Sequence, residues 1–309
     1  MSTWTEIKKS IFPLKGFLII SLLKLMNWLP DRLTGFLGGQ LGLLAYHLSE
    51  KRRRVILTNL KIAFPDKTVD ERRLLAKRAS AASGKLLPEF AKAWLGSQAE
   101  IERQITCVKH QSLINDASSD NQPVIIVTPH IGNWEFLVQW VQINYPMFGL
   151  YSASPIPQLD RLIYKARSQF GCQPFAADNR GVLNLLRKLK QGGLMVILPD
   201  QVPQKGAGVH VPFFGQPAYT MTLLHKMVQK TGAKLLFAYC IRNSNELGFS
   251  ISIEIADFDD QEKQVEVFNT GLNQQIEGII KAFPEQYVWD YKRFKAQPDG
   301  ARLYQKGGD

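Results

Sequence analysis

The chain has 309 residues, of which 45% are apolar and 21% are charged, so it can bury a full hydrophobic core and is not an intrinsically disordered chain. Its three cysteines, Cys107, Cys172 and Cys240, are too few and too widely spaced for a disulfide scaffold or a C-x-x-C zinc site. Of the formal net charge of +11, the first hundred residues hold +9, from 17 basic and 8 acidic side chains. This local basic excess carries no zinc-finger or RNP-type motif, so we expect no nucleic-acid partner.

The N-terminal fifty residues are the most apolar part of the chain. Two helical stretches, 11–29 and 33–48, are separated by Pro30 and followed by a basic run at 51–54. Neither stretch is a continuous span of ~20 apolar residues, because lysines interrupt the first and the second is short and rich in glycine. One tilted span, a helical hairpin in the membrane interface and an apolar support for the core remain open. We favour attachment to a membrane surface, and the flanking basic residues place both ends on the cytoplasmic side.

Two further helices are predicted over 52–64 and 69–95, and Pro88 is expected to kink or break the second. From residue 122 onward, short β-rich runs alternate with helical segments, which is typical of a mainly parallel sheet with helices on both faces. The last two strands read as an antiparallel hairpin at one edge of that sheet. The predicted strands are 124–128, 147–151, 194–198, 235–241 and 249–255, and the predicted helices are 133–143, 157–169, 180–190, 220–231 and 262–282.

This pattern divides the chain into four parts. We expect N-terminal hydrophobic helices that anchor the protein, a helical region packed on the core, an α/β domain that holds the chemistry, and a short polar tail. Their bounds are 1–50, 51–120, 121–298 and 299–309.

The first strand of the α/β domain ends in a motif with a histidine and a carboxylate, His130-Ile-Gly-Asn-Trp-Glu135. In open α/β sheets, ligands bind at the carboxyl ends of the strands. Within one helix, five residues turn ~500°, so the two side chains meet only if His130 lies in the loop and Glu135 in the first turn of a helix capped by Asn133. A carboxylate that holds one imidazole nitrogen leaves the other free to take a proton from an alcohol. Because no G-x-S-x-G elbow is present, the motif predicts direct attack of an external hydroxyl on an acyl group, with His130 as base and Glu135 as its partner. The alternative is a structural histidine at a strand end.

Other residues are candidates for substrate binding. Arg167 suits a substrate phosphate, although it is equally read as a surface arginine. Asp200 ends a strand on the same sheet edge as His130, where it would position Arg167 or a substrate hydroxyl, or cap the next turn. Arg180 is read either as a substrate contact or as a helix start. The stretch 206–215 predicts either an acyl-chain groove or a buried strand, and its groove candidates are Val211, Phe213 and Phe214. We find no P-loop, Rossmann fingerprint or metal-ligand cluster, and we expect no cofactor.

Taken together, these residues resemble the late acyltransferases of bacterial lipid A biosynthesis, the lauroyl and myristoyl transferases, within the glycerolipid-acyltransferase-like superfamily. The motif from His130 to Glu135 is similar to the H-x4-D/E block of that superfamily, with Glu in place of the commoner Asp. Arg167 falls where the family has its second-block arginine. Further blocks follow in the family's order: Arg53-Arg54-Val55 with Asn59-Leu60 and Ala63-Phe64-Pro65, Leu198-Pro199-Asp200-Gln201, Gly208 to Gly215 with its V-P-F-F-G, and Trp289 with Arg293-Phe294-Lys295.

The resemblance implies a fold, a reaction and a location. It implies a glycerolipid-acyltransferase-like α/β fold, an acyl-carrier-protein thioester as donor, and a hydroxyl of a lipid A precursor as acceptor. It also implies the cytoplasmic face of the bacterial inner membrane, with His130 as general base assisted by Glu135. An acidic carrier protein would meet basic surface, for which the runs 51–54 and 72–78 are candidates.

Two alternatives remain open. An acyl-CoA-dependent acyltransferase for another glycolipid, such as phosphatidylinositol mannoside, shares the H-x-G-N-W-D/E motif. A non-catalytic lipid-binding membrane protein is the alternative of another class, and the intact set of site residues argues against it.

Overall fold

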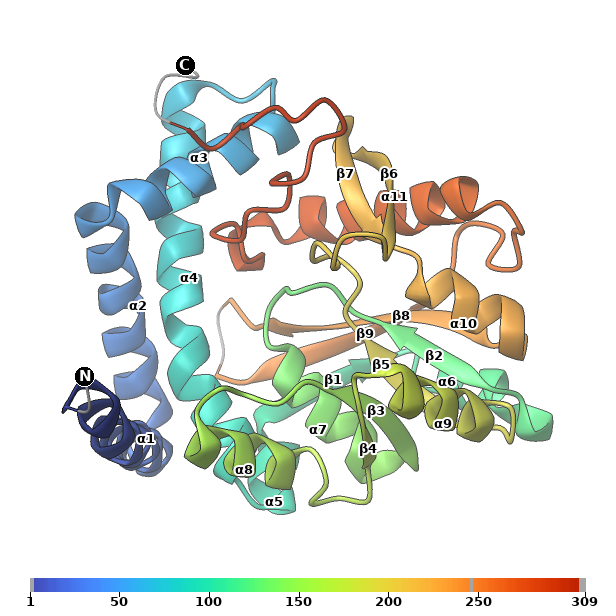
Figure 1. Cartoon of the computed structure of the whole chain (residues 1–309), viewed down its shortest axis with the longest axis horizontal. Coiled ribbons are helices and arrows are strands. Elements are labelled where there is room, and N and C mark those ends of the chain that lie inside the picture. Colours follow the sequence, from blue (N-terminus) through green and yellow to red (C-terminus); the bar gives the residue numbers. More distant parts are fainter. Residues whose placement is uncertain (1–2, 245–246, 306–309) are drawn as a thin grey trace.

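The computed structural model describes residues 3–244 and 247–305, with side chains from Lys15 onward. It shows a layered α/β body with a group of long helices along one side (Figure 1). The helices are α1 (Thr3–Trp28), α2 (Asp31–Leu48), α3 (Glu50–Ala63), α4 (Val69–Leu95), α5 (Gln98–Gln104), α6 (Ser112–Ala117), α7 (Trp134–Asn144), α8 (Pro157–Ala166), α9 (Asn179–Leu189), α10 (Leu223–Thr231) and α11 (Val265–Ala282), with 3-10 turns η1 (Ser119–Asn121) and η2 (Pro284–Gln286). The strands are β1 (Ile105–Lys109), β2 (Val124–Val127), β3 (Met147–Tyr151), β4 (Gln173–Ala176), β5 (Leu194–Ile197), β6 (Gly208–Phe213), β7 (Gln216–Met221), β8 (Lys234–Arg242) and β9 (Phe249–Ile255).

Seven strands form the central sheet in the order β1-β9-β8-β2-β5-β3-β4. All neighbouring pairs are parallel except β8 and β9, which confirms the mainly parallel sheet and the antiparallel pairing of the last two strands. The hairpin does not lie at the edge, because β1 pairs in parallel beyond β9. The sequence predicted neither β1, which lies inside the region expected to be helical, nor β4, because both are short and mix polar with apolar residues.

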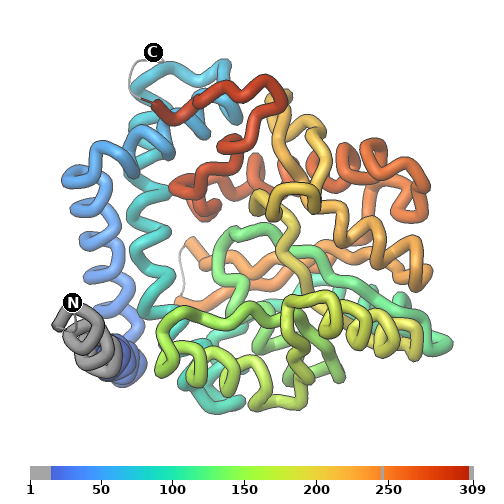
Figure 2. The backbone as a smooth tube through the Cα atoms, in the orientation of Figure 1, coloured from blue at the N-terminus to red at the C-terminus, as the bar shows by residue number. Residues whose placement is uncertain are grey.

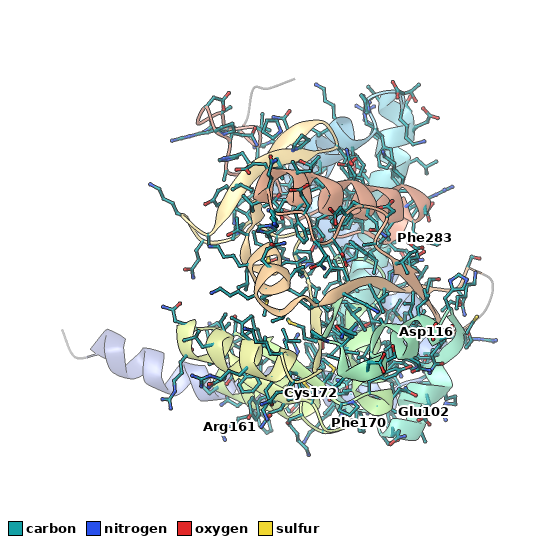
Figure 3. The ribbon with its side chains drawn as sticks, turned by 90° about the vertical axis from the view of Figure 1, so that its right-hand side faces the viewer. Glu102, Asp116, Arg161, Phe170, Cys172 and Phe283 are labelled. Carbon is teal, nitrogen blue, oxygen red and sulfur yellow. The ribbon has the colours of Figure 1, made fainter. Side chains whose placement is uncertain are left out.

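Helices cover both faces of the sheet, as the alternation of strands and helices predicts. In β2, Ile125 and Val127 point into the core shared with α9, α10 and α11, whereas Val124 and Ile126 point into the core shared with α6 and α7. All four side chains are fully buried, which explains why a strand of a parallel sheet is a continuous apolar run. In the side view, α10 and α11 stack above the sheet, and Phe283 marks the end of α11 (Figure 3).

Helices α2 and α4 run side by side and touch through their backbones (Figure 2). A Cβ atom built on Gly42 would lie 2.1 Å from the carbonyl oxygen of Ser80, and one on Gly84 would lie 2.1 Å from that of Gly38. Only glycine permits so close an approach. Helix α4 runs through Pro88 without a break, and α1, α2, α7 and α8 all pack on it.

The first two helices carry an exposed apolar face. The described residues include nineteen exposed large hydrophobic side chains, and eleven of them lie on α1 and α2. A surface of this kind marks an interaction site. Within the part of the chain that the structure describes, no helix combines the length and the apolar composition needed to cross a bilayer. The eleven residues are Phe17, Leu18, Leu22, Leu25, Trp28, Leu33, Phe36, Leu37, Leu41, Leu44 and Leu48.

Candidate active site

The strand register brings His130 and Asp200 together. Val127 of β2 pairs with Ile197 of β5, its parallel neighbour. His130 lies three residues after Val127, and Asp200 lies three residues after Ile197. Both therefore emerge from the same carboxyl edge of the sheet, between adjacent strands. This is the edge at which α/β sheets bind their ligands.

Both ring nitrogens of His130 have hydrogen-bond partners. The Nδ1–H donates to Asp200 Oδ1 at 2.6 Å, and the backbone N–H of His130 donates to Asp200 Oδ2 at 2.9 Å. The Nε2 atom accepts from the side-chain amide of Gln201 at 3.1 Å. A carboxylate on Nδ1 fixes the tautomer in which Nε2 carries the lone pair, which is the form a general base requires.

Asp200 lies in a buried, charged environment. Complete burial raises the pKa of the Asp200 carboxyl, but the charge and hydrogen bonds of His130, together with nearby Arg293, hold it below its ordinary value. Tyr287 has a pKa well above its ordinary value, first because it is buried and then because it faces the Asp200 charge. Arg293 is itself only 2% exposed and donates to the Tyr219 carbonyl at 2.7 Å. These partners favour the ionised form of the Asp200 carboxyl.

The loop that carries His130 is fixed between β8 and the segment that follows α11. Gly132 N–H donates to the Gln286 carbonyl at 3.0 Å, Asn133 N–H donates to the Cys240 carbonyl at 2.7 Å, and Val288 N–H donates to the His130 carbonyl at 3.2 Å. The ring of Trp134 meets the His130 ring edge-on, with centroids 4.9 Å apart. The loop is therefore preorganised by contacts that are distant in sequence.

Replacement of Gly132 by Ala is expected to destabilise the fold by more than about 1 kcal/mol and to lower kcat. Gly132 has φ +54°, and a Cβ atom there would lie 1.9 Å from the Cys240 carbonyl oxygen, so the loop must shift. Gly171→Ala is the matched control, because Gly171 also has positive φ but nothing lies within 4 Å of its Cβ position. Urea unfolding and kcat measure the two effects. Equal losses in the two variants would show that close packing at Gly132 is unimportant.

Glu135 lies in the first turn of α7, and Asn133 caps that helix by accepting from Phe136 N–H at 2.9 Å, as predicted. The expected pairing of Glu135 with the His130 ring was wrong, because both ring nitrogens are bonded to other groups. Glu135 points instead toward α4 and α8. It accepts from Trp94 Nε1 at 2.8 Å and from Arg167 Nη2 at 2.6 Å, and it is only 2% exposed.

Arg167 follows directly after α8, where Gln139 and Gln142 of α7 both donate to the carbonyl of the preceding Ala166. This contact sets the distance between the two helices and so places the guanidinium against Glu135. The Glu135 charge raises the pKa of Arg167 further above its ordinary value. The side chain is 31% exposed, and its Nε is buried with no hydrogen-bond partner among the described residues.

The sequence of the chain matches a family model along nearly its whole length. A family model described as bacterial lipid A biosynthesis acyltransferase matches residues 6–296. The chain belongs to this family. The resemblance drawn from the motifs is confirmed at that level.

Relatives in the family have similar lengths. The chain is 25% identical over 307 residues to a lipid A biosynthesis acyltransferase of Haemophilus influenzae, covering 98% of this chain and 93% of that protein. It is 25% identical over 284 residues to a lipid A biosynthesis lauroyltransferase of Escherichia coli, covering 91% of each chain. It is also 24% identical over 285 residues to a lipid A biosynthesis palmitoleoyltransferase of the same organism, again covering 91% of each.

The remaining candidate substrate-binding residues of this acyltransferase differ in how far they are buried. Arg180 is exposed in the first turn of α9. Val211 and Phe213 are buried in the main core, 3% and 1% exposed, so the predicted acyl-chain groove gives way to the alternative of a buried strand at these two positions. They lie on β6, which pairs with β7 outside the central sheet. Phe214 is partly buried against that core.

The basic runs of this acyltransferase form internal contacts. Arg52 pairs with Asp290 at 2.9 Å, and Arg78 pairs with Glu285 at 2.8 Å. Arg72 donates to three carbonyl groups at the end of α3 and in the following turn. Part of the basic excess therefore joins the helices to the C-terminal segment.

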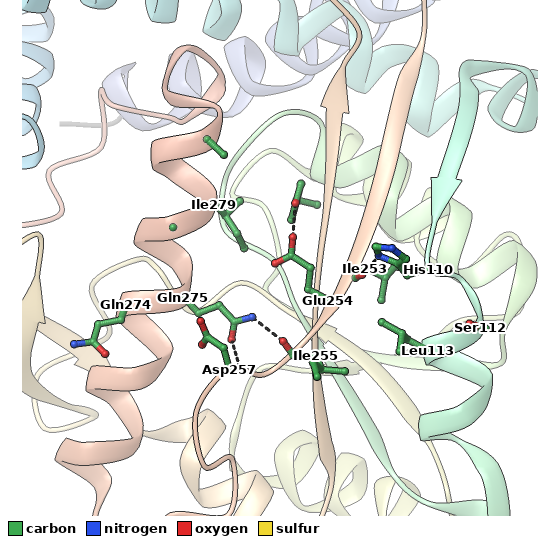
Figure 4. A pocket seen from close by; sticks show the side chains of 13 residues that line it. His110, Ser112, Leu113, Ile253, Glu254, Ile255, Asp257, Gln274, Gln275 and Ile279 are labelled. Carbon is green, nitrogen blue, oxygen red and sulfur yellow. Dashed lines mark hydrogen bonds between the residues drawn. The ribbon is translucent and has the colours of Figure 1, made fainter.

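A separate hollow of about 570 Å³ lies between α11 and the hairpin of β8 and β9 (Figure 4). Its lining includes Glu254, which accepts from Tyr239 at 2.5 Å, and Ile255, which pairs with Leu236 near the start of β8. Its lining includes none of His130, Glu135, Arg167 and Asp200. It is not the candidate active site.

Sequence reasoning missed three residues of the site. Gln201 directly follows Asp200, so its position beside His130 could have been read from the same strand end. Trp94 lies on α4 and Tyr287 lies after α11, and their contacts with the site depend on how these elements pack. No local pattern indicates them.

Proposed function

We propose that this lipid A biosynthesis acyltransferase moves an acyl chain from an acyl-carrier-protein thioester to a hydroxyl of a lipid A precursor, with His130 as general base. The observation that carries the proposal is His130 Nε2, which is held as a hydrogen-bond acceptor by Asp200 on Nδ1 at the carboxyl edge of the sheet. The family match supports the acceptor class.

The proposed reaction is a direct acyl transfer. The acceptor hydroxyl displaces the Gln201 amide from His130 Nε2 and gives its proton to that nitrogen as its oxygen attacks the thioester carbonyl carbon. The carbon–sulfur bond then breaks, the thiolate takes the proton from Nε2–H, and the products are an ester and a free thiol. Asp200 stabilises the imidazolium that exists between the two proton transfers. His130 and the departing thiolate supply every proton acceptor that these reaction steps need.

We assign Glu135 and Arg167 to positioning the acceptor. Their ion pair sits at the start of α7, five residues from the base, and the Arg167 side chain is 31% exposed, so part of it stays accessible to a ligand. A guanidinium with a free donor suits a phosphate on the acceptor. Arg180, exposed at the start of α9, is the second candidate for the same contact.

We propose that the protein lies on the cytoplasmic face of the bacterial inner membrane and contacts its lipids through the exposed apolar face of α1 and α2. Eleven large apolar side chains on that face support the attachment. The basic run 51–54 directly follows α2 and would reach anionic headgroups. Moving an acyl chain from the bilayer into water costs ~0.8 kcal/mol of free energy per CH₂. An enzyme that lies on the bilayer surface avoids most of this cost for an acylated substrate.

The double variant Phe17→Ser/Phe36→Ser is expected to weaken binding to phosphatidylglycerol vesicles by at least about tenfold, because burying each phenylalanine contributes ~1.5–3 kcal/mol. Vesicle flotation measures the effect. Leu74→Ser/Val267→Ser is the matched control, since both residues are exposed and apolar but lie on α4 and α11. If both double variants bind equally well, the attachment does not use α1 and α2.

Mass spectrometry with a panel of donors tests the donor and acceptor. Purified protein is mixed in detergent with a lipid IVA-type acceptor and either acyl-carrier-protein thioesters or acyl-CoA. We expect one added acyl chain with the carrier-protein donors. A product formed only from acyl-CoA with a different glycolipid would contradict the proposal and favour the other acyltransferase branch. The basic runs 51–54 and 72–78 stay candidates for carrier-protein docking, and charge reversal at their exposed Lys51 and Lys77 would then raise KM for that donor alone.

A further inference from the structure

An apolar groove lies between α1 and α2, on the side of α4 that faces away from the sheet. Its volume is about 390 Å³, within the range of ~300–1,000 Å³ typical of small-ligand sites. Helices α1 and α2 each pack on α4 but diverge from each other, so the groove has α4 as its floor. Leu22 and Leu25 of α1 form one wall, Leu37 and Leu41 of α2 form the other, and Pro88 belongs to the floor.

The groove is elongated along α2. Thr34 and Ala45 both line it and are eleven residues apart, which corresponds to about 16 Å along the helix. Almost all of its lining is apolar. A long, narrow and apolar slot fits an extended hydrocarbon chain better than it fits a compact or polar ligand.

One end of the groove carries a cation. Arg52 lines the groove beyond Ala45, and its Nη2 pairs with Asp290. The Arg52 side chain is 28% exposed, and its guanidinium carries further N–H donors besides the Nη2 that contacts Asp290. A guanidinium with an unused donor is suited to a phosphate oxygen. The charge at one end and the apolar slot behind it match an anionic amphiphile.

The mouth of the groove opens on the surface that we propose faces the membrane. The four leucines of its walls are among the exposed apolar residues of α1 and α2, each between 45% and 58% exposed. A lipid can therefore enter from the bilayer without crossing the body of the protein.

The groove is separate from the candidate active site. Leu87 lines the groove, whereas Glu89, two residues later on α4, contacts Asn133 and Arg242 on the side of the sheet. Two residues turn about 200° around a helix, so these side chains point in opposite directions. The groove therefore opens on the side of α4 opposite to the His130 loop, and we take its occupant to be a lipid other than the reacting one.

We propose that this groove binds one acyl chain of an anionic bilayer phospholipid, with the phosphate at Arg52. The inference rests on the proposed membrane attachment and goes beyond the acyl-transfer reaction. The bound lipid would fix the angle between α1 and α2 and so hold the enzyme in one orientation on the membrane.

Photolabelling in vesicles tests the proposal. The full-length protein is bound to vesicles that contain phosphatidylglycerol with a diazirine on one acyl chain, irradiated and digested, and the labelled peptides are identified. We expect label on residues 83–88 of the groove floor, in addition to the label that the membrane-facing residues of α1 and α2 receive from the bilayer. Ala45→Trp, which fills the groove, should abolish this label, whereas Leu44→Trp, on an exposed neighbour outside the lining, should keep it.

A second pair of variants tests the proposed contact between Arg52 and the lipid phosphate. Arg52→Gln is expected to weaken labelling by the phosphatidylglycerol probe by about tenfold, because a charged hydrogen bond is lost. Arg54→Gln is the matched control, since Arg54 pairs with Glu50 and does not line the groove. Thermal unfolding of each variant verifies that the fold is retained.

Three results would overturn the inference. Absence of label on residues 83–88, or label there that survives Ala45→Trp, contradicts it while the protein still floats with the vesicles. Loss of the label on adding excess acylated acceptor would assign the groove to the acceptor instead. Protein that does not float at all would contradict the proposed attachment together with the groove.

Discussion

Replacement of Asp200 by Asn is expected to lower kcat by about 10²–10⁴-fold and to leave KM nearly unchanged. The carboxylate accepts both the Nδ1–H and the backbone N–H of His130, whereas an asparagine side chain offers only one acceptor oxygen. The amide would favour the wrong tautomer of His130 and would not stabilise the imidazolium. Initial rates of ester formation over a range of acceptor concentrations separate kcat from KM.

Glu254→Gln is the matched control for this variant. It makes the same chemical change in a partly buried carboxylate of β9 that accepts from Tyr239 and has no contact with His130. We expect normal kinetics for this control. A normal kcat in Asp200→Asn combined with a strong loss in Glu135→Gln would return the role of His130 partner to Glu135, as the sequence motif first indicated.

Replacement of Arg167 by Met is expected to lower the free energy of unfolding by about 3 kcal/mol, the lower end of the range for breaking a buried ion pair. Glu135 is 2% exposed and would be left charged in an apolar site, with Trp94 as its remaining donor. Urea unfolding measures the loss. The expected loss of unfolding free energy lies at the low end of that range because the Arg167 side chain is 31% exposed to solvent.

The double variant Glu135→Gln/Arg167→Met tests the reason for this loss. Removing both charges leaves no buried, unpaired carboxylate, so the double variant should be more stable than Arg167→Met alone. If Arg167→Met lowers the free energy of unfolding by less than about 0.5 kcal/mol, the Glu135–Arg167 ion pair contributes no more than an ordinary surface ion pair.

The fold was largely predictable from local patterns. Continuous apolar runs such as Val124–Val127 and Leu194–Ile197 identified the central strands, and Asn133 identified the start of α7. The position of Asp200 on the same edge as His130 followed from the parallel arrangement. These features depend on periodicity and capping, which neighbouring residues determine.

The partner of His130 was not predictable in the same way. Asp200 and Glu135 both lie close enough in the fold to be candidates, and the direction of each side chain depends on packing. Trp94 and Arg167 draw Glu135 toward α4 and α8, while the strand register leaves Asp200 beside the imidazole. The edge strand β1 was missed because its five residues follow directly on α5 within a mainly helical region, although Ile105, Thr106 and Val108 are β-branched.

The central claim is that His130 is the base of an acyl transfer to a lipid A precursor. Mass spectrometry of the acceptor after incubation with acyl-carrier-protein thioester and equal amounts of the wild-type protein or His130→Ala tests it most directly. We predict that the acceptor gains the mass of one acyl chain with the wild-type protein and that this product falls by about 10²–10⁴-fold with the variant. Equal yields from the two proteins, with both folded, would contradict the assignment of His130 and with it the proposed mechanism.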